Sequence, residues 1–143
     1  MNQPPSRPGI PGYTKTKDQL ELDAVKSLYA DFTKAYEAKS VSQVLRYVSP
    51  DWEAGDGTSI SDLQTSLSGT FSVFNELKCA ITNVQASKSG QRYKVTYEMA
   101  ITGRIFAQNI KHEEKSSVTE EVAFENGRPV IVRTVTGNFW YFE

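Results

Sequence analysis

The sequence predicts an α+β protein whose N-terminal helices pack on one face of a curved antiparallel sheet. Apolar residues recur at three- and four-residue steps up to about Phe74, as they do in amphipathic helices. From Glu76 onward they alternate with polar residues, as they do in half-buried strands. Helices followed by a run of strands are typical of α+β proteins, in which the helices cover one face of the sheet.

Three helices are expected in the first half of the chain, each opened by capping side chains. They cover residues 18–39, 40–48 and 60–74. The first is long and amphipathic. The second is short because Ser49-Pro50 stops it. The third follows an irregular segment, residues 51–59, and opens at Ser59 or Ser61.

Four strands are expected after the helices. They begin at residue 76, at 93, at about 116 and at 129, and the last runs to 142. The turn SKSG separates the first two, and the charged stretch KHEEK is expected to be a solvated bend before the third, so His112 receives no role. Asn126-Gly127 predicts a two-residue hairpin between the last two strands, because both residues tolerate positive φ angles.

Length and charge limit the classes of function. The chain has 143 residues and a formal net charge of -1, which suits one globular domain and provides no positive field for nucleic acid or an anionic membrane. One cysteine, Cys79, and one histidine, His112, exclude an intramolecular disulfide and the usual zinc ligand sets, although an all-carboxylate metal site stays open. The sequence implies no cofactor.

No apolar run reaches the roughly 18 residues that a membrane span needs, and the N-terminus lacks the pattern of a signal peptide. The chain as given is therefore expected to be cytoplasmic, or exported if a signal peptide has been removed from a precursor. Residues 1–17 hold four of the six prolines and are interpreted as a flexible Pro-rich arm before a single domain, residues 18–143. A Pro-rich ligand segment is the alternative, but only a bare PxxP spacing supports it.

The stretch VTEEVAF places a carboxylate on an apolar strand face. Glu120 shares its face with Val118, Val122 and Phe124. Counting outward from the Asn126-Gly127 turn predicts the following cross-strand neighbours: Glu125 and Arg128, Phe124 and Pro129, Val122 and Ile131, Glu120 and Arg133, and Val118 and Val135. The sequence thus predicts an ion pair between Glu120 and Arg133, either closing the sheet wall or forming the polar end of a ligand pocket.

The order of these elements, with YADFTKAYEAKSVSQVLRYVSPDWEAGDG and FENGRPVIVRTVTG, resembles the nuclear transport factor 2-like superfamily over about residues 18–142. This superfamily includes ketosteroid isomerases, SnoaL-like polyketide cyclases and the association domain of calcium/calmodulin-dependent kinases. The resemblance implies a cystatin-like α+β cone: a strongly curved sheet around the first helix, enclosing an apolar pocket. It also implies a homodimer that pairs through the sheet.

Site residues follow from the same resemblance. Asp56 matches the general base of the ketosteroid isomerases and Glu120 their strand acid, whereas Phe32 replaces the tyrosine of their oxyanion hole. Arg133 matches an inward position of the kinase association domains and suits a carboxylate ligand. Asp56 is otherwise a turn or capping residue, but beside Trp52 in apolar surroundings its pKa would be raised.

Aromatic residues supply the expected pocket lining. Tyr29, Tyr36, Tyr93 and Tyr97 fall on apolar faces, and one of them is a candidate to replace the donor missing at Phe32. In the closing NFWYF, one aromatic pair is expected to be covered by dimerisation.

Two hypotheses follow from these residues. The first is a non-catalytic module that binds a small, apolar or carboxylate-bearing ligand through Arg133, Tyr36, Tyr97, Trp52 and Phe32. The second is a cofactor-free isomerase, lyase or cyclase that transfers protons through Asp56 and Glu120.

Overall fold

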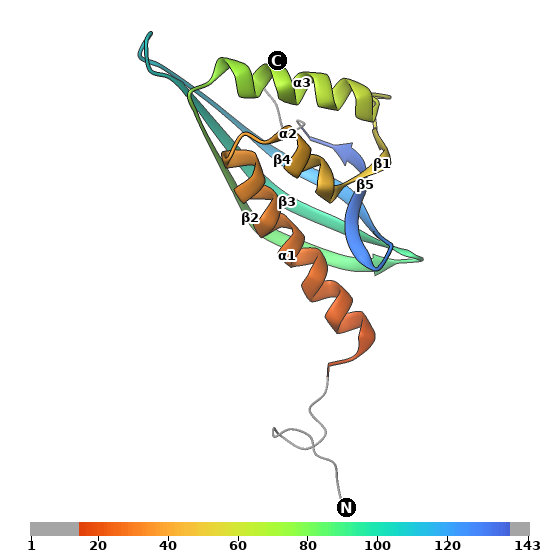
Figure 1. Cartoon of the computed structure of the whole chain (residues 1–143). Helices are drawn as coiled ribbons and strands as arrows, with labels where there is room; N and C mark the ends of the chain where they lie inside the picture. Colours follow the sequence, from red (N-terminus) through yellow and green to blue (C-terminus); the bar gives the residue numbers. More distant parts are fainter. Residues whose placement is uncertain (1–14, 138–143) are drawn as a thin grey trace, which may run out of the picture.

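The computed structural model describes residues 15–137, and it confirms the predicted α+β architecture. Helix α1 (Lys17–Glu37) lies against a curved five-stranded sheet, and helix α3 (Ile60–Val73) runs across one end of it (Figure 1). Between them lie the short helix α2 (Val41–Val44) and the 3-10 turn η1 (Leu45–Tyr47). The capping predictions hold at Ser40 and Ser59, whose side chains accept backbone N–H bonds.

The sheet is mixed, because it contains one strand that the sequence analysis did not predict. Strand order is β1-β5-β4-β3-β2, and only β1 (Val48–Ala54) is parallel to its neighbour, β5 (Arg128–Thr136). The segment 51–59 was expected to be irregular, and for residues 51–54 that expectation is wrong. Pro50 is tolerated because β1 is an edge strand, where a missing N–H does not break a ladder.

The remaining strands form an antiparallel meander, as predicted. They are β2 (Glu76–Ser89), β3 (Arg92–Ile105) and β4 (Ile110–Glu125). Strand β4 begins six residues before the predicted start near 116, so KHEEK is strand and not a bend, and His112 pairs with Gly103. The predicted hairpin at Asn126-Gly127 is confirmed, with φ angles of 55° and 80°.

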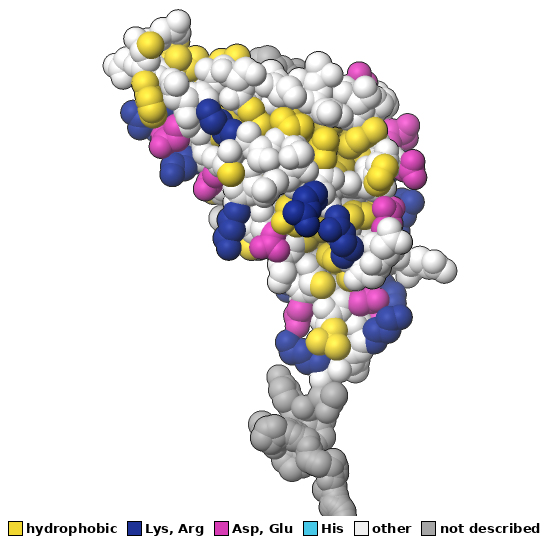
Figure 2. All heavy atoms as spheres, in the orientation of Figure 1, with side chains coloured by type: hydrophobic (Ala, Val, Ile, Leu, Met, Phe, Trp, Pro, Cys, Tyr) yellow, Lys and Arg dark blue, Asp and Glu magenta, His cyan; other side chains and the backbone are white. Residues whose placement is uncertain are grey.

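The core lies between α1, α3 and the face of the sheet that they cover, which we call the inner face. Hydrophobic side chains show beneath α3 in the space-filling view, and on that side of the molecule basic and acidic side chains are mixed (Figure 2). No helix in residues 15–137 is both long enough and apolar enough to cross a membrane. The aromatic residues of NFWYF, and residues 1–14 of the Pro-rich arm, lie outside the described part of the chain.

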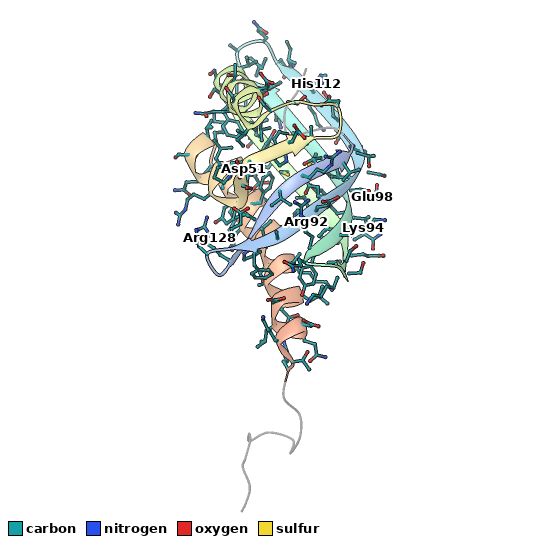
Figure 3. The ribbon with its side chains drawn as sticks, turned by 90° about the vertical axis from the view of Figure 1, so that its right-hand side faces the viewer. Asp51, Arg92, Lys94, Glu98, His112 and Arg128 are labelled. Atoms are coloured by element: carbon teal, nitrogen blue, oxygen red, sulfur yellow. The ribbon has the colours of Figure 1, made fainter. Side chains whose placement is uncertain are left out.

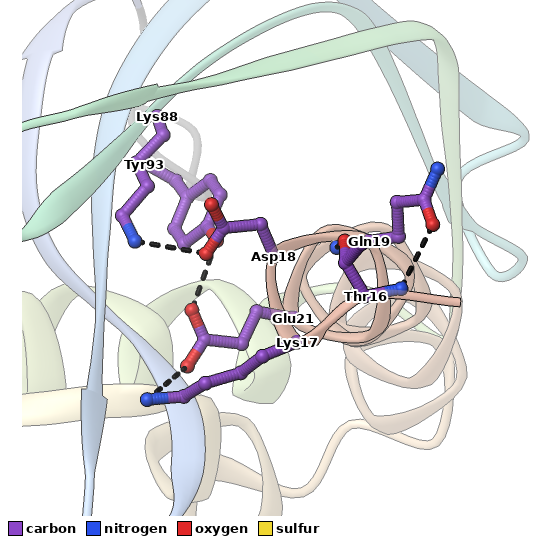
Figure 4. Close-up of polar contacts among 7 residues, drawn as sticks. All are labelled: Thr16, Lys17, Asp18, Gln19, Glu21, Lys88 and Tyr93. Carbon is purple, nitrogen blue, oxygen red and sulfur yellow. Dashed lines mark hydrogen bonds and ion pairs between the residues drawn. The ribbon is translucent and has the colours of Figure 1, made fainter. Parts of the chain in front are cut away.

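Both ends of α1 are tied to the sheet by polar contacts. At the N-terminal end, Lys88 lies 3.0 Å from Asp18, and the Tyr93 hydroxyl donates to Glu21 at 2.9 Å (Figure 4). At the C-terminal end, Glu37 accepts the backbone N–H of Cys79 at 2.8 Å, which covers part of the free edge of β2. The middle of the helix is held differently, through a buried carboxylate.

Candidate functional site

Glu120 is completely buried on the inner face of β4. Its neighbours on that face, Val118 and Val122, are buried as the alternation in VTEEVAF predicts. Ionised carboxylates are almost never buried without compensation, because removal from water disfavours the charged form. The contacts of Glu120 therefore decide what this residue does.

Three hydroxyl groups donate to the Glu120 carboxylate. Tyr29 on α1 and Tyr97 on β3 both donate to Oε1 at 2.9 Å, and Thr134 on β5 donates to Oε2 at 2.7 Å. The two tyrosine rings also pack together, with centroids 4.9 Å apart. Two of the four tyrosines that the sequence placed on apolar faces thus converge on one acid.

Trp52 fixes the direction of the Thr134 hydrogen bond. The indole N–H of Trp52, on β1, donates to Thr134 Oγ1 at 3.0 Å, and an indole nitrogen cannot accept. The hydroxyl hydrogen of Thr134 is therefore available for Glu120. Trp52 and Tyr97, both predicted to line a pocket, are instead members of a buried hydrogen-bonded cluster with Glu120, Tyr29 and Thr134.

Burial raises the pKa of Glu120 from its ordinary 4.5 to about 7, and the bonds from Thr134, Tyr97 and Tyr29 act in the opposite direction. Among the described residues, no ion pair involves Glu120. The carboxylate is held by neutral hydroxyls alone. Its pKa near neutrality follows from this arrangement, because a nearby cation would favour the ionised form.

The predicted ion pair between Glu120 and Arg133 is wrong. The pairs predicted by counting from the turn are confirmed from Glu125 to Val122. The register then shifts, so that Glu120 pairs with Thr134 and Glu121 with Arg133. An extra residue, Val132, stands in β5 at that point, as in a β-bulge. One inserted residue exchanges the two faces, so Thr134 points inward and Arg133 outward.

Arg133 consequently belongs to the outer face of the sheet. Its side chain is 40% exposed, and its nearest carboxylate is that of Glu53, at 3.9 Å. The same face carries Arg92, Lys94 and Glu98 from β3 (Figure 3). A ligand inside the cone does not reach Arg133 in this arrangement.

Asp56 lies in an exposed turn and not in the core. Its Oδ1 accepts the backbone N–H of Thr58 at 3.0 Å and the Thr58 hydroxyl at 2.7 Å. These hydrogen bonds lower the pKa of Asp56, whereas an inward-facing base beside Trp52 was expected to have a raised pKa. The structure thus contradicts the prediction of Asp56 as a pocket base and supports its interpretation as a turn residue.

Phe32 and Tyr36 are both fully buried, and they differ in one polar atom. The Tyr36 hydroxyl is the one buried side-chain polar atom, among the described residues, for which no hydrogen-bond partner is found. Its ring packs edge-on against Phe71 of α3, with centroids 5.1 Å apart. Burial raises the Tyr36 pKa, and the negative charges of Cys79 and Glu114 add to the shift.

Glu114, whose charge acts on Tyr36, lies at the α3 end of the inner face with His112 beside it. Ile101 pairs with Cys79 on one side and with Glu114 on the other, so these three residues form one row across the sheet. His112 Nε2 lies 3.2 Å from Glu114 Oε2, and Figure 3 shows His112 beside α3. The inner face of β4 therefore changes from apolar to polar between Val118 and Ser116.

Three hollows are formed by described residues, and Glu120 is not among the residues that line them. A groove of about 390 Å³ lies between α1 and β2, and Tyr29, Lys26 and Cys79 are among its lining residues. A second lies on the outer face beside Arg92, and a third lies between α1 and the β4–β5 hairpin. Among the residues described, no group of three or more His, Cys, Asp or Glu side chains is placed to hold a metal ion.

Three members of these clusters, Thr134, His112 and Glu114, are not predicted by the sequence pattern. Thr134 was missed because its inward position depends on the bulge. His112 and Glu114 were missed because KHEEK was interpreted as a bend, although His112, Glu114, Ser116 and Val118 continue the period of two. That alternation is the pattern from which the longer strand could have been predicted.

This fold is a cystatin-like α+β fold, which several solved structures share. The chain is similar to a putative scytalone dehydratase from Novosphingobium aromaticivorans, with a TM-score of 0.75 and 12% identity over 85% of this chain and 87% of that one. It is also similar to a hexachlorocyclohexane dehydrochlorinase, LinA type 2, with a TM-score of 0.67 and 15% identity over 84% and 86% of the two chains.

A third similar structure, a Nostoc punctiforme protein of unknown function, is described as having a cystatin-like fold. Its TM-score is 0.62, with 12% identity over 81% of this chain and 89% of that one. No family model matches the sequence, and no curated protein matches it. At these identities the likeness establishes the fold, and function has to be argued from the residues.

Proposed function

We propose that the protein binds a small, mostly apolar molecule at the α3 end of the inner face. The observation that carries this proposal is the buried Tyr36 hydroxyl, for which no partner is found among the described residues. Buried polar atoms are nearly always hydrogen-bonded, and an exception calls for a ligand or an ordered water. A ligand with a neutral oxygen would satisfy the hydroxyl.

The surroundings of Tyr36 suit such a ligand. Phe71, Met99 and Ile101 are apolar and buried, and the His112 and Glu114 pair provides polar groups in the adjoining rows of the sheet. Small-molecule sites usually combine an apolar lining with a few polar groups. Arg133 takes no part in this proposal because it lies on the other face of the sheet.

The proposal is tested with p-cresol and toluene, two probes that differ by one hydroxyl group. Binding is measured by two-dimensional NMR titration of the full chain and of the variants Tyr36→Phe and Tyr93→Phe. We expect Tyr36→Phe to weaken p-cresol about fivefold, the worth of one hydrogen bond, and to leave toluene unchanged.

Two controls accompany this measurement. Tyr93→Phe removes a hydroxyl that donates to Glu21 at the far end of α1, and Arg133→Met removes the predicted carboxylate contact, so neither should alter p-cresol binding. Chemical-shift changes should centre on Ile101 and Phe71. If wild type binds neither probe, or if the shifts map to the α1–β2 groove, the proposal is wrong.

A second candidate function is a cofactor-free proton-transfer enzyme, a lyase, isomerase or cyclase, and the His112 and Glu114 pair favours it. A carboxylate that accepts from an imidazole fixes the tautomer and the orientation of the ring, as it does for the general base of a catalytic triad. Two similar structures bear the names of a dehydratase and a dehydrochlorinase, and both names describe eliminations. Asp56 is not proposed as the base, and Glu120 can act on a ligand only through Tyr29 or Tyr97.

A nitrobenzisoxazole tests this second candidate, because removal of its ring proton by a base breaks the N–O bond and releases a coloured phenolate. We expect His112→Gln to lower the rate of ring opening about a hundredfold and p-cresol binding to persist. A rate in wild type no higher than in His112→Gln would exclude His112 as the base and leave the binding proposal standing.

A further inference from the structure

We infer that Glu120 is a buried proton-binding site, and that its proton controls how often the middle of helix α1 opens from the sheet. This inference goes beyond the proposed function, because it requires no ligand and concerns a different cluster. It depends on the burial of Glu120, on the nature of its three donors and on the element that each donor belongs to.

The cluster joins one helix to four strands. Tyr29 belongs to α1, Tyr97 to β3, Glu120 to β4 and Thr134 to β5, and Trp52 connects β1 through Thr134. The titratable groups that contact the carboxylate are Tyr29 and Tyr97, since Thr134 and Trp52 do not titrate. Only Tyr29 comes from an element outside the sheet, so the Tyr29 hydrogen bond is the link that an opening of α1 breaks.

The ionised and neutral forms of Glu120 need different hydrogen bonds. An ionised carboxylate accepts all three hydroxyl hydrogens, which is the arrangement observed. A protonated one must also donate a hydrogen, and Thr134 Oγ1 already accepts from Trp52. The proton is donated to one of the three hydroxyl oxygens, and that hydroxyl turns its own hydrogen away from the acid.

The free-energy cost of burial, by contrast, favours the protonated form of Glu120. The ionised form leaves a negative charge in the core with no cation, and three neutral donors only partly replace the water that it loses. When α1 opens, water reaches the carboxylate and this cost disappears. Opening is therefore favoured after the proton is lost, and the closed helix is favoured while the proton is bound.

A route for the opening lies beside the cluster. The groove of about 390 Å³ between α1 and β2 is lined by Tyr29, and β2 bulges next to it at Asn83, whose φ angle is 57°. The ends of α1 are tied to the sheet by Asp18 and Glu37, as described above. A small outward movement of the middle of the helix would admit water to Glu120 without releasing those ends.

The experiment combines two measurements on the full chain between about pH 5 and about pH 9. Infrared difference spectroscopy follows the protonated carboxyl band, which Glu120→Gln should remove. Amide hydrogen exchange, corrected for intrinsic rates, follows the protection of residues 26–33 of α1. We expect the band to disappear in the neutral range. The protection should fall by up to about tenfold per pH unit below that midpoint and level off above it, because closed and open states are then both ionised.

Variants decide between proton control and a merely structural acid. In Glu120→Gln the amide mimics the protonated acid, so the α1 protection should no longer depend on pH. Tyr93→Phe, the matched control, should keep the wild-type pH dependence, because its hydroxyl bonds Glu21 at the helix end. The inference is overturned by a band that is absent at pH 5, by one that persists at pH 9, or by equal pH dependence in Glu120→Gln.

A further variant covers the case in which Glu120→Gln does not fold. Thr134→Val keeps the acid and removes a hydrogen bond that lowers the Glu120 pKa. The midpoint of the carboxyl band, and with it the pH at which the α1 protection levels off, should move to higher pH. If these two pH values do not move together, the proton does not control the helix.

Discussion

Thr134 donates a hydrogen bond of 2.7 Å to Glu120 and pairs with it across the sheet. Counting outward from the Asn126-Gly127 turn predicts Arg133 at this place. A neutral hydroxyl and an arginine both lower the pKa of a buried acid, but the arginine does so far more strongly. The arginine would stabilise the charge and lower the pKa of Glu120, whereas the hydroxyl leaves burial as the dominant effect. One bulged residue in β5 therefore decides whether Glu120 titrates near neutral pH.

Stability should fall as pH rises through neutrality. The pKa of Glu120 is about 7 in the folded chain and about 4.5 in the unfolded chain, so the folded state binds more protons between these values. The associated stability is complete below about pH 4.5 and is lost as pH rises through 7, a total of about 3 kcal/mol. Urea unfolding at a series of pH values measures it, and an unchanged slope in Glu120→Gln would refute the assignment.

Thr134→Val should lower the free energy of unfolding by about 1–3 kcal/mol. The substitution keeps the shape of the side chain but removes the hydroxyl that accepts from the Trp52 indole N–H and donates to Glu120. Thr136→Val on the same strand is the control, because Thr136 is exposed. Equal effects of the two substitutions in urea unfolding would contradict the proposed role of the cluster.

Removing the hydroxyl group from either of two tyrosines on α1 should change the free energy of unfolding differently. Tyr29→Phe removes a donor to Glu120 and should cost about 1–3 kcal/mol. Tyr36→Phe removes a hydroxyl for which no partner is found, so the free energy of unfolding should be unchanged or up to about 1 kcal/mol higher. Thermal unfolding without ligand distinguishes them, and a large loss in Tyr36→Phe would reveal a hidden partner.

Gly103 and Gly69 form a matched pair for alanine substitution. A Cβ at Gly103 would lie 2.6 Å from the Phe74 ring, so Gly103→Ala should cost about 1–3 kcal/mol through overpacking. At Gly69, in α3, a Cβ meets nothing within 4 Å, and Gly69→Ala should stabilise by about 0.5–1 kcal/mol. Chemical denaturation measures both, and a neutral Gly103→Ala would mean that Phe74 moves freely.

We propose a homodimer that pairs through the outer face of the sheet. Half-buried small side chains occupy its middle, among them Thr96 and Thr119, which pair across β3 and β4. Thr119→Lys places a charge there and should convert a dimer to a monomer in sedimentation velocity. Lys111→Glu, near the β3–β4 hairpin tip, should not. A wild-type chain that sediments as a monomer at high concentration would exclude the dimer.

The sequence by itself determined the features that depend on local spacing. Helical and strand periods predicted α1, α3 and the meander, and Asn126-Gly127 predicted the last hairpin. The burial of Glu120 among valines was also visible in the alternation of VTEEVAF. Each of these depends on residues a few positions apart, so the chain itself carries the signal.

Only the tertiary structure decided which side chains meet Glu120. The bulge at Val132 arises where β5 must pair with β1 and β4 at once, and β1 is recognisable as a strand only through its parallel pairing with β5. Tyr29 reaches Glu120 across 91 positions of sequence. Register and long-range packing depend on several strands together, so the hydrophobic period of one segment does not predict them.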